Sequence, residues 1–315
     1  MTRKVILDMD PGHDDALAIL LAARHLEVLG ITTVHGNGTV EKTTVNTLKI
    51  LEVAGLTHIP VARGMAAPLI NELHTGAMIH GESALDGVDL PEPTTPLDAR
   101  DAVTFIIETV RAHEGVTLVP TGPLTNVATA LRRAPDIAGR IPEISLMGGS
   151  AAGGNITASA EANIYHDPEA AHIVFSSGVP IKMAGLDITR QAAATAERRE
   201  RMRALGNRTG QVAAAWLDFY AGRLELLHHL DSASLHDVVS VAWLIDPTLI
   251  QSKTMHVVVE LKGEHTRGMT VCDRRPGVDV DDDINRRLPP NTEVGLTLEV
   301  ERFFEQLITT LATYP

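Results

Sequence analysis

The sequence contains a single cysteine, Cys272, among its 315 residues. An intramolecular disulfide is therefore excluded, and nothing supports the disulfide framework of a small secreted protein. No apolar run reaches the roughly 18–20 residues that a membrane-spanning helix requires. The first apolar run meets acidic residues too soon to form the core of a signal peptide. These absences predict a cytoplasmic protein.

Basic residues are also scarce, with 27 Lys and Arg against 40 Asp and Glu, which gives a formal net charge of −13. A chain this acidic repels phosphate backbones and anionic lipid headgroups, so we expect neither nucleic acid nor a membrane as a partner. The hydrophobic share of 44% and the charged share of 21% are typical of a globular protein and exclude a disordered or collagen-like chain.

Short apolar runs rich in β-branched residues alternate with helical patterns along most of the chain. Strands are expected near residues 5–7, 28–34, 59–62, 116–120, 144–147, 181–184, 256–261 and 268–271, and helices near 14–24, 41–54, 101–112, 123–133, 167–176, 195–205, 209–228, 236–245 and 299–312. This alternation predicts an α/β fold with a mostly parallel, Rossmann-like central sheet flanked by helices. No linker or repeat divides the chain, so we expect one domain over residues 1–315. The run of acidic residues at 279–283 predicts a solvated turn.

Polar, turn-prone clusters follow several of these strands. They are residues 8–15, 35–38, 121–126 and 148–150. Because ligands bind beyond the carboxyl ends of the strands in an open parallel sheet, these clusters predict an active site at that edge.

The first cluster holds four carboxylates, Asp8, Asp10, Asp14 and Asp15, within eight residues. Asp8 and Asp10 leave the strand on the same side, and Asp14 and Asp15 open the next helix. A solvated helix cap would explain either Asp14 or Asp15 alone. Four crowded carboxylates repel one another unless a cation neutralises them, and hard divalent cations prefer oxygen ligands. We therefore predict a divalent metal site.

Three further segments carry polar groups without a decisive pattern. His80 lies in a glycine-rich loop, and His236 with Asp237 precedes a helical pattern. Residues 153–163 carry amides and a carboxylate without apolar periodicity. An ordinary helix start explains His236 and Asp237 as well as a binding role does. A surface loop likewise explains residues 153–163.

Taken together, these residues resemble the inosine-uridine preferring nucleoside hydrolase family. The N-terminal ILDMDPGHDDALAI resembles the family's DxDPGxDDAxA signature. The family's later blocks are matched in order by PTGPLTNVA, MGGSAAGGNITASAEANIYHDPEAA, MAGLDIT, LHDVVSVAWLIDP and RGMTVCD. The resemblance runs from about residue 4 to the C-terminus, and it implies the nucleoside hydrolase fold.

The resemblance implies a Ca²⁺-dependent N-ribohydrolase that splits pyrimidine ribonucleosides or inosine into ribose and free base. It implies metal ligation by Asp10, Asp15, the Thr121 carbonyl and Asp237, with Asp10 also the general base for the metal-bound water and Asp8 supporting the cluster. Ribose hydroxyls would be held by Asp14, Asn37, Asn155, Glu161 and Asn163. His80 and His236 would border the nucleobase and protonate it as it leaves. A homo-oligomer, dimer or tetramer, is also implied.

Two departures from the family's pattern affect nucleobase preference. Ala84 stands where the HGxxGL loop usually has glycine, and Ala162 replaces the aromatic residue of the AEFN-like element. Two other readings stay open from the sequence. A phosphatase of the haloacid dehalogenase type also begins with a strand and DxD, although Gly12 occupies a position where that pattern requires Thr or Val. A non-catalytic nucleoside-binding protein is the second.

Overall fold

The computed structural model describes residues 2–275 and 288–315, so the acidic run at 279–283 lies outside the described part. The main sheet contains β1 (Lys4–Met9), β2 (Glu27–Thr33), β3 (Val61–Arg63), β4 (Val116–Pro120), β5 (Ile144–Met147), β6 (Ile181–Ala184), β9 (Ile250–Met255) and β12 (Thr292–Leu298). The longer helices are α1 (His13–His25), α2 (Val40–Val53), α4 (Ala102–Ala112), α5 (Thr125–Arg133), α7 (Pro168–Phe175), α9 (Ala196–Arg203), α10 (Arg208–His228), α11 (His236–Ile245) and α12 (Val300–Leu311). Shorter elements are α3 (Ala77–His80), α6 (Ala162–His166), α8 (Leu186–Thr189), the 3₁₀ turns η1 (Pro135–Arg140) and η2 (Pro247–Leu249), and the strand pairs β7 (Ala193–Ala194) with β8 (Ala233–Ser234) and β10 (Val257–Val259) with β11 (Thr270–Cys272).

The eight strands of the main sheet follow the order β3-β2-β1-β4-β5-β6-β12-β9. All neighbouring pairs are parallel except β12 with β9, which is antiparallel. The chain leaves β1 toward β2 and β3 on one side, and then returns to place β4 on the other side of β1. This reversal opens a crevice at the carboxyl ends of β1 and β4, where α/β sheets bind ligands.

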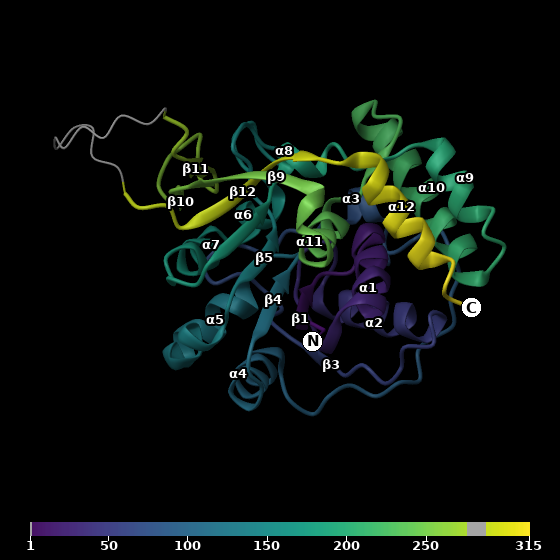
Figure 1. Ribbon diagram of the computed structural model, residues 1–315, viewed down its shortest axis with the longest axis horizontal. Coiled ribbons are helices and arrows are strands. Elements are labelled where there is room, and N and C mark those ends of the chain that lie inside the picture. Colours follow the sequence, from purple (N-terminus) through teal and green to yellow (C-terminus); the bar gives the residue numbers. More distant parts are fainter. Residues whose placement is uncertain (1, 276–287) are drawn as a thin grey trace.

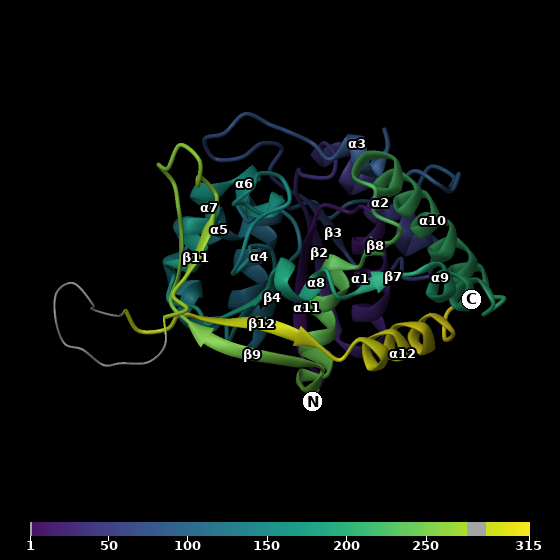
Figure 2. The same cartoon turned by 90° about the horizontal axis from the view of Figure 1, so that it is seen from above.

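Helices cover both faces of the sheet, as Figure 1 shows, with α4, α5 and α7 on one face and α1, α2, α11 and α12 on the other. Two apolar cores result, one on each face. Helix α1 is covered on most of its surface because α10, α11 and α12 all pack against it. Figure 2 shows α12 running along the outside of this layer, next to the β9–β12 edge. The carboxylates that open α1 are therefore attached to a rigid, deeply buried element.

The predicted α/β class and the mostly parallel sheet are confirmed, and the strands at residues 116–120, 144–147 and 181–184 have the predicted bounds. Strands β9 and β12 were not predicted from the sequence. In the described part of the chain, no helix is both long and apolar enough to cross a membrane.

Candidate active site

The carboxylates predicted from the first cluster meet at the crevice between β1 and β4. Asp8, still within β1, points below the crevice, where its Oδ1 accepts hydrogen bonds from Thr32 Oγ1 at 2.6 Å and from Asn126 Nδ2 at 2.8 Å. Asp15 belongs to the first turn of α1, and it accepts from the Gly12 amide at 3.0 Å and from Thr121 Oγ1 at 2.8 Å. Asp8 therefore supports the site from beneath, and Asp15 links the segments that follow β1 and β4.

Asp237 joins this group from the far end of the chain. Oxygen atoms of Asp14, Asp15 and Asp237 lie within 4.8 Å of one another, a spacing that can hold a metal ion, and all three residues are buried. The Asp14 Oδ2 accepts from the backbone amides of His236 at 3.1 Å and Asp237 at 3.4 Å. Asp14 thus caps the N-terminus of α11, and this bond places Asp237 beside α1.

Asp10 occupies a narrow slot between two glycines. A Cβ atom at Gly36 would lie 2.0 Å from Asp10 Oδ2, and one at Gly122 would lie 2.6 Å from Asp10 Oδ1. The Oδ2 accepts from the Asn37 backbone amide at 2.7 Å, whereas the buried Oδ1 has no hydrogen-bond partner. An unpartnered buried carboxylate oxygen is costly, which indicates that a ligand outside the chain completes its contacts.

Burial raises the pKa of every carboxyl group in this cluster, and repulsion between the carboxylates raises it further at Asp10, Asp14 and Asp237. Burial, with the charge of Asp15 next, raises the pKa of Asp14 to about 7. The same two causes raise the pKa of Asp10 well above its usual range, and burial with the charge of Asp14 does so for Asp237. In the described part of the chain, no Lys or Arg contributes to the pKa shifts of Asp10, Asp14 or Asp237. A divalent cation with oxygen ligands fits this donor set, because it would supply the missing positive charge.

Polar residues predicted to hold a sugar surround the carboxylates. Asn37 donates its side-chain amide to the Asp10 carbonyl at 3.1 Å and to Asp15 Oδ2 at 3.2 Å. Asn163 donates to the Thr121 carbonyl oxygen at 2.7 Å. That carbonyl, a predicted metal ligand, therefore faces the cleft between α1 and α6.

The segment before α6 fixes two more of the predicted residues. Glu161 caps α6, with Oε1 accepting from the Asn163 amide at 2.9 Å and Oε2 accepting from Gly149 at 2.9 Å. Asn155 Oδ1 accepts from the Ala162 amide at 2.9 Å, which leaves its NH₂ group available to a ligand. Residues 153–163, ambiguous in sequence, are thus held in place by their own polar side chains.

His80 lies at the end of α3 and is locked by a chain of hydrogen bonds. His13 Nε2 is 2.7 Å from the Asp86 carbonyl oxygen, and His13 Nδ1 is 3.0 Å from His80 Nδ1. Because a carbonyl only accepts, neutral His13 carries its proton on Nε2, and His80 must then donate from Nδ1. Burial lowers the pKa of His13 to about 4 and the pKa of His80 well below its usual range. Neutral His80 therefore presents Nε2 as an acceptor.

His236 has more freedom. Its Nδ1 lies 2.7 Å from Thr189 Oγ1, a hydroxyl that can donate or accept. Burial, followed by the nearby charge of Arg190, lowers the pKa of His236 to about 4. Its neutral ring can thus direct either an acceptor or an N–H group into the cleft.

The predicted residues line one cleft with two lobes. The inner lobe, about 180 Å³, contains nine of them: Asp14, Asn37, His80, Thr121, Asn155, Glu161, Asn163, His236 and Asp237. The outer lobe, about 390 Å³, shares His236, Asn155 and Tyr220 with the inner one. Asp10 and Asp15 are absent from both linings and lie beneath the inner lobe.

Several lining residues escaped the sequence analysis. Tyr220 stacks near both His80 and His13, with ring centroids 5.0 and 5.4 Å away, but it lies in the middle of a long helix with no local motif. His74, His166 and Arg190 also line the cleft. His13 could have been suspected, because it stands inside the aspartate-rich cluster.

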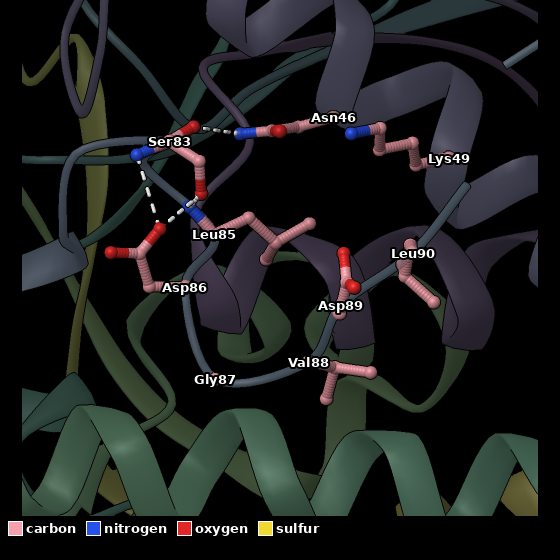
Figure 3. A pocket seen from close by; sticks show the side chains of 9 residues that line it. All are labelled: Asn46, Lys49, Ser83, Leu85, Asp86, Gly87, Val88, Asp89 and Leu90. Atoms are coloured by element: carbon pink, nitrogen blue, oxygen red, sulfur yellow. Dashed lines mark hydrogen bonds between the residues drawn. The ribbon is translucent and has the colours of Figure 1, made fainter. Parts of the chain in front are cut away.

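A separate cavity of about 350 Å³ lies between α2 and the loop that follows His80. Figure 3 shows its lining, which includes Asn46, Lys49, Asp86 and Asp89 together with apolar side chains. None of the predicted site residues contributes to it. This cavity is therefore separate from the cleft that the predicted residues line.

The departure at Ala84 has a visible structural consequence. Ala84 adopts φ +66°, in the left-handed region that favours glycine, and its side chain is buried. A Cβ atom on Gly38 would lie only 2.9 Å from the Ala84 Cβ. The loop thus keeps a glycine-type conformation at the expense of some backbone strain.

Comparisons with known proteins agree with this geometry. The family model described as inosine-uridine preferring nucleoside hydrolase matches residues 5–305. A protein named pyrimidine-specific ribonucleoside hydrolase RihA from Photobacterium profundum is 44% identical over 100% of both chains. One of the same name from Shewanella woodyi is 46% identical over 87% of this chain and 89% of its own. Among solved structures, a purine-preferring ribonucleoside hydrolase from Gardnerella vaginalis is 35% identical, with a TM-score of 0.90 over 98% of each chain.

Proposed function

Because the chain belongs to the inosine-uridine preferring nucleoside hydrolase family, and is therefore an enzyme that hydrolyses the N-glycosyl bond of nucleosides, we propose that it is a Ca²⁺-dependent N-ribohydrolase of pyrimidine ribonucleosides. The observation that carries the proposal is the buried carboxylate cluster at the floor of a cleft lined by amides. Such a cluster binds a hard cation and the hydroxyl groups of a sugar at the same place. The phosphatase alternative is set aside by the family membership.

Ca²⁺ would be held by Asp10, Asp15, Asp237 and the Thr121 carbonyl oxygen, and Asp14 is close enough to contribute. When bound, the ion would neutralise these groups and make a water molecule more acidic. The unpartnered Oδ1 of Asp10 supports its assignment as the base. The Asp10 carboxylate accepts a proton from the water that attacks C1′, and Gly36 and Gly122 keep this carboxylate fixed in position.

The amides of Asn37, Asn155 and Asn163, with Asp14 and Glu161, hold the ribose hydroxyls. Positive charge develops on the sugar ring as the glycosidic bond breaks, and the surrounding carboxylates stabilise it. The base then lies toward the outer lobe, beside Tyr220 and His236. We assign the donation of a hydrogen bond to the base to His236, because neutral His80 carries no proton on Nε2.

Pyrimidine preference is supported by the two relatives of 44% and 46% identity that carry that name. The Gardnerella vaginalis structure, named purine-preferring, is less similar at 35% identity. We also propose that the protein forms a homo-oligomer, either a dimer or a tetramer.

The test is a panel of uridine, cytidine, inosine and adenosine, assayed for released ribose with saturating Ca²⁺ and after chelation. Release from uridine and cytidine, lost on chelation and restored by Ca²⁺, is expected. Full activity in the chelated protein would contradict the metal assignment, and faster release from inosine and adenosine would contradict the base preference. Nucleoside binding without any release would favour the non-catalytic alternative. Sedimentation velocity gives the oligomeric state.

A further inference from the structure

The outer lobe of the cleft contains one permanent positive charge. Arg190 directly follows α8, and it lines this lobe together with His236 and Asn155. Among the described residues that line either lobe, Arg190 is the only Lys or Arg. Its Nη2 donates to the Gly154 carbonyl oxygen at 2.7 Å, which holds the guanidinium across the lobe from α8 to the loop before Asn155.

The Arg190 side chain is exposed, and no carboxylate among the described residues pairs with it. Within residues 2–275 and 288–315, no carboxylate oxygen lies within 4.0 Å of it, and neither Nε nor Nη1 has an acceptor. By contrast, Arg198 and Arg199 nearby in the sequence pair with carboxylates at 2.5 and 2.7 Å. The positive charge of Arg190 and the N–H groups on its Nε and Nη1 atoms are therefore available to bind a ligand.

We propose that Arg190 donates a hydrogen bond to a carbonyl oxygen of the pyrimidine and stabilises the negative charge that the base acquires as it leaves. This inference rests on the proposed function, because it requires a base with carbonyl oxygens in the outer lobe. It also gives separate roles to two adjacent residues at the end of α8, since Thr189 contacts and orients His236 while Arg190, which follows the helix, supplies the charge.

The chemistry requires such a group. When the C1′–N1 bond breaks, its electron pair stays with the base, and the charge spreads over N1 and the carbonyl oxygens. The water oxygen forms the new bond to C1′ and passes a proton to Asp10, and the anionic base takes up a proton from solvent after the bond has broken. A planar guanidinium matches the edge of an anionic pyrimidine better than a point charge does.

The first experiment compares wild type, Arg190→Ala and Arg190→Lys on uridine, 5-fluorouridine and p-nitrophenyl riboside. Arg190→Ala should lower kcat/KM about tenfold on uridine, the effect of losing one charge-assisted hydrogen bond from an exposed guanidinium. The loss should be smaller on 5-fluorouridine and least on p-nitrophenyl riboside, whose leaving groups are better, and Lys should restore part of it. Arg274→Ala is the control, because Arg274 donates to the Ala151 carbonyl at 3.3 Å without lining the cleft.

The second experiment does not depend on turnover. Barbiturate, an anionic pyrimidine at neutral pH, and neutral uracil are titrated into the same proteins. Arg190→Ala should weaken barbiturate binding about tenfold, the effect of one charge-assisted hydrogen bond, and uracil binding far less. Equal losses on all three substrates, or equal losses for barbiturate and uracil, would overturn the inference. The proposed function fails separately, if the wild type releases no uracil from uridine.

Discussion

We expect the affinity of the metal-free protein for Ca²⁺ to depend steeply on pH. In the metal-free fold, burial raises the pKa of Asp14 to about 7, and the pKa values of Asp10 and Asp237 are raised as well. The cation must displace the protons that these groups hold. One displaced proton makes the affinity tenfold stronger per pH unit, so Ca²⁺ affinity should rise at least about 100-fold between pH 5 and pH 7.

The raised pKa of Asp14 also makes the stability of the metal-free protein depend on pH. The folded chain holds the Asp14 proton up to about pH 7, whereas the ordinary value is 3.8, so stability is lost as the pH rises between these values. About three pKa units correspond to roughly 4 kcal/mol. Buried histidines whose pKa values fall to about 4 act in the opposite direction, so the informative quantity is the difference in Tm with and without Ca²⁺. That difference should grow from pH 4 to pH 7.

Calorimetric titration of Ca²⁺ at pH 5, 6 and 7, in two buffers with different heats of ionisation, measures both the affinity and the protons released. Asp14→Asn should reduce the slope of log affinity against pH by about one. Asp136→Asn removes an exposed carboxylate paired with Arg111 and should leave that slope unchanged. An affinity that stays within threefold from pH 5 to pH 7 would refute the reasoning.

Three further results are expected. Gly122→Ala should lower kcat/KM for uridine more than 100-fold and cost about 1–3 kcal/mol of stability, because the new Cβ would displace Asp10. The control Gly139→Ala has open space around its Cβ and should change neither quantity. Unaltered turnover in Gly122→Ala would count against Asp10 as the base. Uridine should exceed 2′-deoxyuridine in kcat/KM by at least about tenfold, because a missing hydroxyl leaves buried polar groups unpaired at ~1–3 kcal/mol each; equal values would exclude the ribose contacts. His236→Ala should reduce kcat strongly for uridine and much less for p-nitrophenyl riboside, and similar losses on both would assign His236 to folding or ribose positioning.

The sequence was informative where the signal is local. Buried strands such as Val116–Pro120 are short apolar runs, and the aspartates after β1 are adjacent in the chain, so both could be predicted. Strand β9 was missed because it is an edge strand with four exposed, polar positions, and β12 was missed because Gly295 interrupts its apolar pattern. Neither resembles the continuous apolar run of a central parallel strand.

The site residues that were missed act through tertiary contacts. Tyr220 reaches the imidazoles only because α10 packs beside α1, and Arg190 acquires its place through a bond to a loop 36 residues away. The roles of the two histidines could not be separated in sequence either. Their difference depends on the proton that His13 must place on Nε2 to reach the Asp86 carbonyl.

The hydrogen bond between Asp14 and His236 joins residues 222 positions apart, and it has a consequence for the order of folding. The proposed ligand set is complete only when the segment that carries α11 docks on the N-terminal strand and helix, because Asp237 belongs to α11. Closing so long a loop is a late and slow event. Ca²⁺ should therefore lengthen the lifetime of the folded protein by slowing its unfolding, and leave the rate of folding nearly unchanged.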